Sequence, residues 1–543
     1  MIVKNIRKQI DGNTIFDNIS FGLNTQDKAG LVGINGSGKS TLLKVLGGII
    51  TNDNGTIDLD GDSIGYLYQE IPIKYNNYTI EKYIKEIVGF TELEKRLHFL
   101  ENNLSEDNMD EYGDVLNAFL NVNGYSFDEE LNKIMSGLSL NKNLNSQIGH
   151  LSGGERIKVL LATLLMMNRD ILLLDEPTNN LDITAIEWLE KYLKTSSKKM
   201  IIVSHDEMFL NNIVNKIFEL DSGELRQYNT SYKDYLITKK QEYEKRKLEY
   251  EQAKDQRDKL KVKLEQAKSW SSKGLGSKAH NDNDKIANNF AKEKTNTGNV
   301  ARLTKELEKV DIPYFEEHKP INLIFNFSDV SGNKDIGLEN LVCGYETFQT
   351  PKIDLVIPFG AKFMISGGNG SGKTTLIKTI LGKLSAVSGK VNIGNGVRIG
   401  YISQNTLEAN TDESIYAYIT SDIVEKDSTQ IFTLFDKLNF DYDDRNKPYN
   451  ILSPGERTRI NIIKLILNNI NVLILDEVTN HLDKDGLDII YELISSYPGT
   501  IISISHNRKY NEILNADIEL NMEDGQVNYR KLIKSKINYQ VYW

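Results

Sequence analysis

The chain has 543 residues, a formal net charge of −11 at pH 7, 39% hydrophobic residues and 26% charged residues. This is the composition of a folded globular protein, and the length exceeds that of one ordinary hydrophobic core, so we expect about two to four domains. The single cysteine, Cys343, excludes an internal disulfide, a cysteine-built zinc site and an iron–sulfur cluster, and it favours a reducing compartment.

The N-terminal segment lacks the apolar core of a secretory signal, so no signal peptide is predicted. The most apolar stretch, residues 159–177, is interrupted by Asn168, Arg169 and Asp170 and is too short to span a bilayer. We therefore expect a cytoplasmic protein that has no membrane domain of its own.

The sequence contains one long internal repeat. The segment GINGSGKS at residues 33–40 reappears as GGNGSGKT at residues 367–374. In both copies, short apolar runs alternate with helical stretches, which is typical of mostly parallel sheets covered by helices on both faces. We therefore expect an α/β fold with two P-loop domains, at residues 1–229 and 325–543, joined by a linker at residues 230–324.

Each copy carries its glycine-rich segment between an apolar strand and a helix, which is the setting of a P-loop. The glycines allow backbone N–H groups to surround phosphate oxygens, and a helix N-terminus favours negative charge. We expect Lys39 and Lys373 to reach the β- and γ-phosphates of ATP, and Ser40 and Thr374 to hold Mg²⁺. The nucleotide-contacting residues are predicted to be Gly33, Ile34, Asn35, Gly36, Ser37, Gly38, Lys39, Ser40, Gly367, Gly368, Asn369, Gly370, Ser371, Gly372, Lys373 and Thr374.

An acidic pair ends an apolar strand in each copy. Asp175 and Asp476 close the runs ILLLD and VLILD, so they should project from the carboxyl edge of the sheet beside the phosphates. We expect both aspartates to bind or orient Mg²⁺. Glu176 and Glu477 follow directly and are placed to polarise a water molecule aimed at the γ-phosphate.

A histidine follows the next apolar strand of each copy, His205 in VSHD and His506 in ISHN. A single histidine after a strand is usually a structural hydrogen bonder. Here the histidine recurs at the same place, one strand beyond each acidic pair. We therefore expect both side chains to contact the γ-phosphate.

The segments LSGGER, residues 151–156, and LSPGER, residues 452–457, are not general features of P-loop domains. With Gln69, Gln404, the acidic pairs and the histidines, they resemble the ATP-binding-cassette (ABC) family over almost the whole chain outside the linker. In that family two cassettes enclose two ATP molecules head to tail, and each signature segment faces the P-loop of the other cassette. The resemblance implies one site made of Lys39, Ser40, Gln69, Asp175, Glu176 and His205 with Ser453 and Gly455. It implies a second site made of Lys373, Thr374, Gln404, Asp476, Glu477 and His506 with Ser152 and Gly154, and both glutamines are implied to lie at the metal as well.

Three positions depart from the family pattern. Ile10 stands where an aromatic side chain often stacks on adenine, a role that Tyr345 fits in the second copy. Pro454 replaces a signature glycine and removes one N–H donor. Val478 stands where the first copy has Pro177. We expect unequal sites that both hydrolyse ATP.

The linker is predicted to be a charged helical hairpin. Residues 232–268 contain no glycine or proline and are rich in strong helix formers, and Ala253, Leu260 and Ala267 are spaced by sevens. A break follows at 269–277, after which helical character resumes. Residues 231–310 carry 20 Lys/Arg and 13 Asp/Glu, a net charge of +7 in an otherwise acidic chain. A localised anionic partner is therefore indicated.

The tip of this hairpin is predicted at about residues 269–283. It contains Trp270, Lys273, Lys278 and His280. An indole can stack on a base and lysines can contact phosphates, so these four residues are candidate RNA contacts.

Tandem cassettes joined by such a hairpin resemble the ABC-F proteins, which act on the ribosome. The resemblance implies that the ATP-bound cassettes occupy the E site of the bacterial 70S ribosome, with the hairpin directed at the P-site tRNA and the peptidyl-transferase region. Some members serve translation generally, and others protect ribosomes from antibiotics. The LSPGE signature and the long hairpin favour the protective group. The alternatives are a housekeeping translation factor and the ATPase subunit of a transporter with separate membrane partners. We expect a monomer with intramolecular cassette pairing and no stable DNA partner.

The two copies differ in length between their P-loop and their signature. The P-loop lysines are 334 residues apart but the signature serines only 301, so the first copy carries about 33 additional residues. They fall within residues 70–150. These residues are either a ribosome-contacting arm or an enlarged helical subdomain.

Overall fold

The structure, a computed structural model, describes residues 1–140, 142–274, 299–311, 313, 325, 332–345, 348–403, 411–421, 428–438, 440–480, 482, 484–523 and 525–532. Met1–Tyr232 and the second copy of the repeat form one compact unit, and the linker from Lys233 to Pro320 forms another. Gln404, Lys278 and His280 lie outside the described residues, as do the side chains of Trp270 and Lys273.

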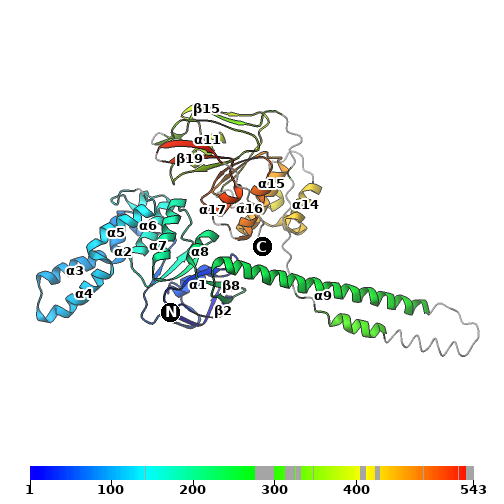
Figure 1. Cartoon of the computed structure of the whole chain (residues 1–543), viewed down its shortest axis with the longest axis horizontal. Coiled ribbons are helices and arrows are strands. Elements are labelled where there is room, and N and C mark those ends of the chain that lie inside the picture. Colours follow the sequence, from blue (N-terminus) through cyan, green and yellow to red (C-terminus); the bar gives the residue numbers. More distant parts are fainter. Residues whose placement is uncertain are drawn as a thin grey trace, which may run out of the picture. The chain divides into compact units, whose positions relative to one another are not determined.

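The first cassette is built on a six-stranded sheet and a three-stranded antiparallel sheet (Figure 1). The larger sheet is parallel except for its last strand, and its order is β5 (Ile64–Tyr66), β6 (Ile171–Asp175), β7 (Lys199–Val203), β3 (Lys28–Val32), β8 (Lys216–Asp221) and β9 (Glu224–Tyr228). The smaller sheet has the order β2 (Asn13–Gly22), β1 (Ile2–Ile10) and β4 (Asn54–Asp58).

The second cassette repeats both sheets. Its larger sheet has the order β16 (Ile399–Ser403), β17 (Val472–Asp476), β18 (Thr500–Ile504), β14 (Lys362–Ser366), β19 (Ile518–Glu523) and β20 (Gln526–Lys531). Its smaller sheet has the order β13 (Ile353–Ile357), β10 (Ile336–Val342) and β15 (Ser388–Ile393), and the short strands β11 (Gly344–Tyr345) and β12 (Phe348–Gln349) form a separate pair. The predicted α/β class with two equivalent domains is confirmed.

The central strands are apolar because both of their faces are covered. Every residue of β6 and β17 is buried, including the terminal aspartates. The helices of the first cassette are α1 (Lys39–Leu46), α2 (Ile80–Val88), α3 (Phe90–Asn102), α4 (Met109–Asn121), α5 (Phe127–Gly137), α6 (Gly153–Met166), α7 (Ile183–Thr195) and α8 (Glu207–Ile213). Those of the second are α11 (Lys373–Ile380), α13 (Ile415–Thr420), α14 (Ser428–Lys437), α15 (Pro454–Leu467), α16 (Lys484–Ser496) and α17 (Arg508–Leu514).

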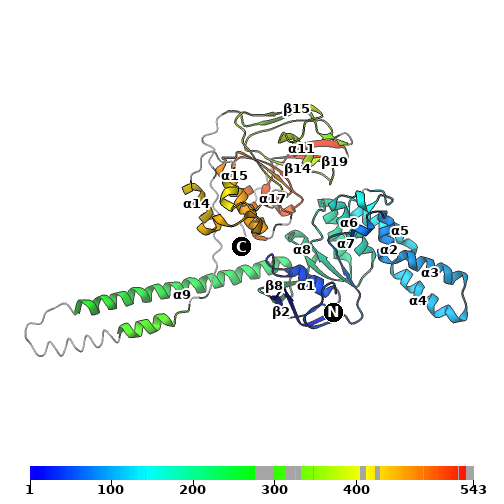
Figure 2. The ribbon, with the colours of Figure 1, turned by 180° about the vertical axis from the view of Figure 1, so that it is seen from behind.

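The additional residues of the first cassette form a helical hairpin. Thr79 caps α2 and Ser414 caps α13 in the same way, and α5 and α14 occupy the same place before the signature. Within the residues that the structure describes, the antiparallel pair α3–α4 lies between these positions in the first cassette and has no counterpart in the second (Figures 1 and 2). Its base packs on the cassette through Phe90, whose ring centroid lies 4.3 Å from that of Phe127. The insert is therefore a defined two-helix projection.

The linker contains the long helix α9 (Tyr232–Gly274), which has 43 residues. Residues 299–308 are also helical. Leu264 and Ala267 of α9 form a buried cluster with Leu303, so the two stretches pack as the predicted hairpin. The predicted break at residues 269–277 does not begin at Ser269, because residues 269–274 belong to α9, and residues 275–277 lie outside the described residues. Serine and tryptophan have only moderately lower helix propensity than the best helix formers, so a helix can include them.

Among the helices that the structure defines, none combines the length and the apolar character needed to cross a membrane.

Candidate nucleotide-binding sites

The two P-loops have nearly identical backbones. Gly38 and Gly372 each have a φ of 98° and precede the first helical residue of α1 and α11. Gly33 approaches the neighbouring strand so closely that a Cβ atom there would lie 2.3 Å from the carbonyl oxygen of Leu220. Gly367 is equally constrained by Met522, at 2.1 Å. Glycine is therefore required at both positions to fold the loop against the sheet.

The P-loop lysines turn back onto their own loops. Lys39 Nζ donates to the carbonyl oxygens of Gly33 and Ile34 at 2.7 and 2.9 Å, and Lys373 Nζ donates to those of Gly367 and Gly368 at 2.9 and 2.8 Å. Both ammonium groups are thus held above the loop, where the phosphates of a nucleotide would lie. Burial lowers the pKa of Lys373, since desolvation disfavours its charged form.

Each cassette places a hydroxyl group against a strand-end carboxylate. Thr374 Oγ1 donates to Asp476 Oδ1 at 3.4 Å, and Ser40 hydrogen-bonds Asp175. Gln69 Nε2 donates to Asp175 Oδ2, also at 3.4 Å. Burial is the main cause that raises the pKa of both aspartates. Hydroxyl and carboxylate oxygens are the ligands that Mg²⁺ prefers, so these residues fit the metal that accompanies ATP.

The two glutamates share a strained backbone conformation. Glu176 and Glu477 both have a φ of 51°, in the left-handed region that non-glycine residues rarely occupy. Their backbone N–H groups donate to the carbonyl oxygens of Val203 and Ile504, each at 2.9 Å. Such strain costs on the order of 1 kcal/mol or more and concentrates at functional sites. Its recurrence in both copies marks these turns as candidate catalytic elements.

Each glutamate faces the histidine of its own cassette. His205 Nε2 lies 3.4 Å from Glu176 Oε1, and His506 Nε2 lies 3.9 Å from Glu477 Oε1. Burial raises the pKa of both glutamates. Burial, followed by the positive charge of Lys373, lowers the pKa of His506 to about 4. His506 is therefore neutral at pH 7 and can accept or donate a hydrogen bond without carrying charge.

The signature segments begin helices through capping boxes. Ser152 Oγ accepts from the backbone N–H of Glu155 at 3.4 Å, and Ser453 Oγ accepts from that of Glu456 at 3.3 Å. Each glutamate carboxylate in turn accepts from the backbone N–H of its serine. Pro454 occupies the first helical position of α15, where the N–H group has no partner within the helix. The proline is thus compatible with the same helix start.

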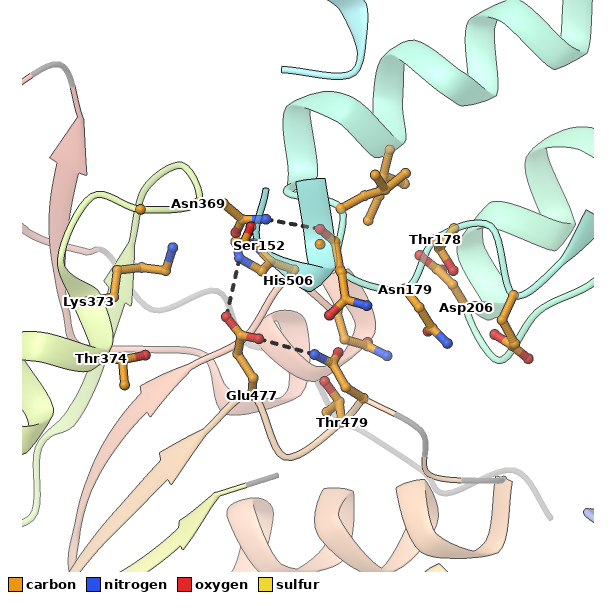
Figure 3. A pocket seen from close by; sticks show the side chains of 18 of the residues that line it. Ser152, Thr178, Asn179, Asp206, Asn369, Lys373, Thr374, Glu477, Thr479 and His506 are labelled. Atoms are coloured by element: carbon orange, nitrogen blue, oxygen red, sulfur yellow. Dashed lines mark hydrogen bonds and ion pairs between the residues drawn. The ribbon is translucent and has the colours of Figure 1, made fainter. Parts of the chain in front are cut away.

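Residues of both cassettes line one pocket of about 370 Å³ (Figure 3). Ser152 and Gly154 of the first signature line it together with Lys373 and Thr374 of the second P-loop. The remaining lining residues that sequence analysis singled out are Glu176, His205, Asn369, Gly370, Gly372, Glu477 and His506. The pocket therefore brings the second P-loop together with the first signature, the pairing that the family resemblance implies, but it also contains Glu176 and His205, which the resemblance implies for the other site.

The cassettes also touch directly at this pocket. Asn369 Nδ2 in the second P-loop donates to the carbonyl oxygen of Asn180 at 2.9 Å. Ser453, Gly455, Lys39 and Ser40 do not line this pocket, so the pairing of the first P-loop with the second signature stays a prediction.

Some site residues were not predicted from the sequence. Asn180 lies in the segment TNNLD, which follows the first acidic pair. The dipeptide Thr-Asn of this segment recurs after the second acidic pair, and this repetition could have marked the segment as functional. Phe348 lines the pocket, and a Cβ at Gly372 would lie 3.0 Å from its ring. Tyr345, half exposed, is not among the lining residues. At the equivalent place in the first cassette, a Cβ atom at Gly38 would lie 2.6 Å from Ile15 Cγ2, so an isoleucine takes the place of the phenylalanine there. Phe348 is a second aromatic residue only three positions after Tyr345, and this proximity could have marked it as an alternative adenine contact.

Fold and site together define an ABC-type ATPase domain that is present twice in one chain. Residues 16–179 and 351–480 match the family model described as ABC transporter. Putative ATP-binding protein YdiF of Bacillus subtilis is 31% identical over 534 residues, which cover 95% of this chain and 79% of that protein. ABC transporter F family member 5 of Arabidopsis thaliana is 30% identical over 541 residues, 96% of this chain and 75% of that protein.

A solved structure shares the arrangement at low sequence identity. It is a chain from the complex of archaeal ribosomal stalk protein aP1 and archaeal ribosome recycling factor aABCE1, with a TM-score of 0.57 and 17% identity, covering 95% of this chain and 87% of that one. This likeness concerns the fold. The sequence relatives are more specific, and the chain belongs to the ABC-F family of tandem-cassette ATP-binding proteins.

Proposed function

We propose that the chain hydrolyses ATP to ADP and phosphate at sites composed of both cassettes. The observation that carries this proposal is the shared pocket, in which Ser152 of one cassette lines the same space as Lys373 and Glu477 of the other. A nucleotide bound there would touch both cassettes, and its γ-phosphate would meet the N-terminus of α6, which has 14 residues. Binding would then favour cassette closure, and hydrolysis would release it.

The metal ligands in this proposal are a hydroxyl and an aspartate in each cassette. Thr374 with Asp476, and Ser40 with Asp175, would hold Mg²⁺, and Gln69 would approach it in the first cassette. Bound Mg²⁺ would neutralise charge on the β- and γ-phosphates. The prediction for Gln404 falls outside the described residues.

The chemical step is assigned to the glutamates. Glu477 would accept a proton from water as the water oxygen bonds to the γ-phosphorus and the bond to the ADP oxygen breaks. Its raised pKa makes it a stronger base than an exposed glutamate. Neutral His506 would hold a γ-phosphate oxygen by a hydrogen bond. Glu176 would be the base at the other site and His205 would contact the γ-phosphate there, and both residues also line the pocket that contains Lys373.

We further propose that the target of this ATPase is the bacterial ribosome in the cytoplasm. Membership of the ABC-F family, the likeness to a fold found in a ribosome recycling factor and the basic linker support this proposal. The hairpin would enter toward the P-site tRNA and the peptidyl-transferase centre, with Trp270, Lys273, Lys278 and His280 as RNA contacts. Protection against antibiotics at that centre would follow from this placement, and a housekeeping translation role is the alternative.

A variant that binds ATP but cannot hydrolyse it tests the ribosomal assignment. With both Glu176→Gln and Glu477→Gln, ATP should hold the protein on 70S ribosomes in sucrose gradients and arrest translation. The matched control adds Lys39→Ala and Lys373→Ala, which should abolish the co-sedimentation. Absence of the glutamine variant from ribosomal fractions, or co-purification with a membrane permease, would contradict the proposal.

Resistance is tested separately. Expression in a susceptible bacterial host should raise tolerance to drugs that bind the peptidyl-transferase centre. Unchanged susceptibility to such drugs would favour the housekeeping role.

A further inference from the structure

A shielded ion-pair cluster joins the two cassettes beside the nucleotide pocket, and one of its members, Asp206, also lines that pocket. Arg508, the first residue of α17, donates from Nη1 to Glu190 Oε2 at 3.2 Å, and its Nη2 also pairs with the other oxygen of Glu190. The same Nη2 lies 3.6 Å from Asp206 Oδ2. The exposed fractions of the Arg508, Glu190 and Asp206 side chains are 15%, 11% and 11%. Ion pairs this shielded are costly to break, unlike exposed surface bridges.

A second ion pair lies beside the first. Lys509 Nζ donates to Glu207 Oε2 at 2.8 Å, which joins the start of α17 to the start of α8. Glu190 is held from its own side by Asn212, whose Nδ2 donates to Glu190 Oε2 at 3.1 Å. The first cassette therefore presents a preformed acidic acceptor to the basic end of α17.

The charges in this cluster break the symmetry of the repeat. With the offset of 301 that aligns the signatures, Arg508 corresponds to Glu207, Asn507 to Asp206, and Tyr491 to Glu190. At this place the first cassette carries carboxylates where the second carries cations or neutral groups. Two first cassettes, or two second cassettes, would face each other with like charges, so the surface favours pairing of unlike cassettes.

The cluster also connects the two histidine-bearing loops. Asp206 follows His205 directly, and its Oδ1 caps α8 by accepting from the backbone N–H of Phe209 at 3.0 Å. Arg508 lies two residues beyond His506, where Asn507 caps α17. The ion pair between Asp206 and Arg508 thus spans from the loop of one ATP site to the loop of the other.

Tyr232, the first residue of α9, lies in the same surroundings. Its side chain is buried, and its pKa is raised well above the usual value, first by burial and then by the charges of Glu207, Asp488 and Asp206. Glu207 and Asp206 belong to the first cassette and Asp488 to the second, so charges of both cassettes act on the pKa of Tyr232. A change in their pairing would therefore alter the environment of Tyr232.

We propose that Arg508, with Glu190 and Asp206, selects the pairing of unlike cassettes and couples the histidine loops of the two ATP sites, so that both sites close together. This inference rests on the proposed ATP hydrolysis, in which Arg508 would be a positioning residue. Arg508 acts through the loops of His205 and His506 and touches no reacting atom. Loss of its charge would leave Glu190 and Asp206 facing each other without a cation, which disfavours closure.

A charge swap in the full chain tests this assignment. The initial ATPase rate is measured against ATP concentration for wild type, Arg508→Glu, Glu190→Arg and the double variant. We expect each single variant to lower kcat/KM by about tenfold or more and to reduce the Hill coefficient toward one. All of these proteins, including the reference, also carry Asp206→Asn, because the carboxylate introduced at position 508 would otherwise face Asp206. On that background the double variant should recover to within about threefold of the reference, since the pair is restored with reversed polarity. The control is the same swap in Lys390 and Glu339, an exposed ion pair within the second cassette, and each control single variant should stay within about twofold.

Circular dichroism and thermal melting of every variant separate coupling from folding. A folded Arg508→Glu with wild-type kinetics would overturn the proposal, and so would a double variant as impaired as the single ones. If Arg508→Glu does not fold, recovery of folding and activity in the double variant still supports the pairing, and failure of that recovery refutes it. A wild-type chain that hydrolyses no ATP refutes the proposed function, whereas an active wild type with an unrescued swap refutes the coupling alone.

Discussion

The side chain of Asn369 in the second P-loop donates a hydrogen bond to the carbonyl oxygen of Asn180, at 2.9 Å. Asn180 follows Glu176 in the first cassette. The bond therefore connects the P-loop of the second cassette to the segment that follows the candidate catalytic glutamate of the first. The first prediction concerns this bond. Asn369→Ala should weaken ATP-dependent cassette closure by about 1 kcal/mol, the net value of one hydrogen bond, which is on the order of fivefold in apparent ATP affinity.

The matched control for this bond is Asn35→Ala, the equivalent substitution in the first P-loop. Titration of a fluorescent ATP analogue measures both variants. An Asn369→Ala protein that binds the analogue as tightly as wild type would show that the bond plays no part in closure.

The second prediction concerns base recognition. Phe348 lies against Gly372 and lines the pocket, so an adenine ring above the second P-loop would rest on its face. Phe348→Ala should weaken nucleotide binding at the second site by about two- to tenfold, the value of one aromatic contact. Tyr345→Ala is the control and should have the smaller effect. If Tyr345→Ala proves the more damaging in calorimetric titration, Tyr345 is the stacking residue that the sequence predicts.

The third prediction is an acid-sensitive contribution from His506. Its pKa is lowered to about 4 in the folded chain, so between the ordinary value of 6.5 and about 4 the unfolded chain binds a proton that the folded chain does not. Stability must therefore fall as the pH drops through this window and be unaffected above it. The full contribution is on the order of 3 kcal/mol.

Melting temperatures measured from pH 7 to pH 4 test this point. His506→Gln should flatten the loss of stability across that range, because glutamine does not titrate. Parallel curves for the variant and wild type would exclude His506 as the source of the acid sensitivity.

The fourth prediction concerns the α3–α4 hairpin. In the sequence of the second cassette only residues 421–427 separate α13 from α14, so we expect that residues 89–126 of the first cassette can be replaced by that sequence. We expect the shortened chain to keep its ATPase activity within about twofold, because neither helix lines the pocket. Removal exposes Phe127, which now packs on Phe90, so the melting temperature should fall by a few degrees.

Ribosome co-sedimentation of the shortened chain then decides between the two readings of the hairpin. Lost binding with intact ATPase activity would identify it as a contact arm. Unchanged binding would identify it as an enlargement of the helical subdomain.

The parts of the fold and site that could be predicted are those encoded by local sequence. The P-loops require glycine at Gly33, Gly38 and their counterparts because of steric contact and positive φ, and such requirements leave a recognisable pattern. The aspartates at the ends of β6 and β17 were recognisable because the preceding residues are fully apolar. The capping boxes at Ser152 and Ser453 likewise depend only on residues three apart.

The features that could not be predicted from the sequence depend on tertiary contacts. No sequence motif connects Arg508 with Glu190 and Asp206, which lie about 300 residues before it. They come together only because the two cassettes pack against each other. The extent of α9 was not predicted, because residues 269–274 include serine and glycine, which are weak helix formers, and are nevertheless helical. Whether Tyr345 or Phe348 stacks on adenine depends on the geometry of the short strands β11 and β12. The spacing of residues in the sequence does not define that geometry.

Cryo-electron microscopy can show whether one ATP lies between Lys373 of one cassette and Ser152 of the other. The sample is the Glu176→Gln, Glu477→Gln chain with Mg²⁺ and ATP. We expect density for the γ-phosphate within hydrogen-bonding distance of both Lys373 Nζ and Ser152 Oγ. Nucleotide held by the second P-loop alone, with Ser152 turned away and the cassettes apart, would contradict this expectation.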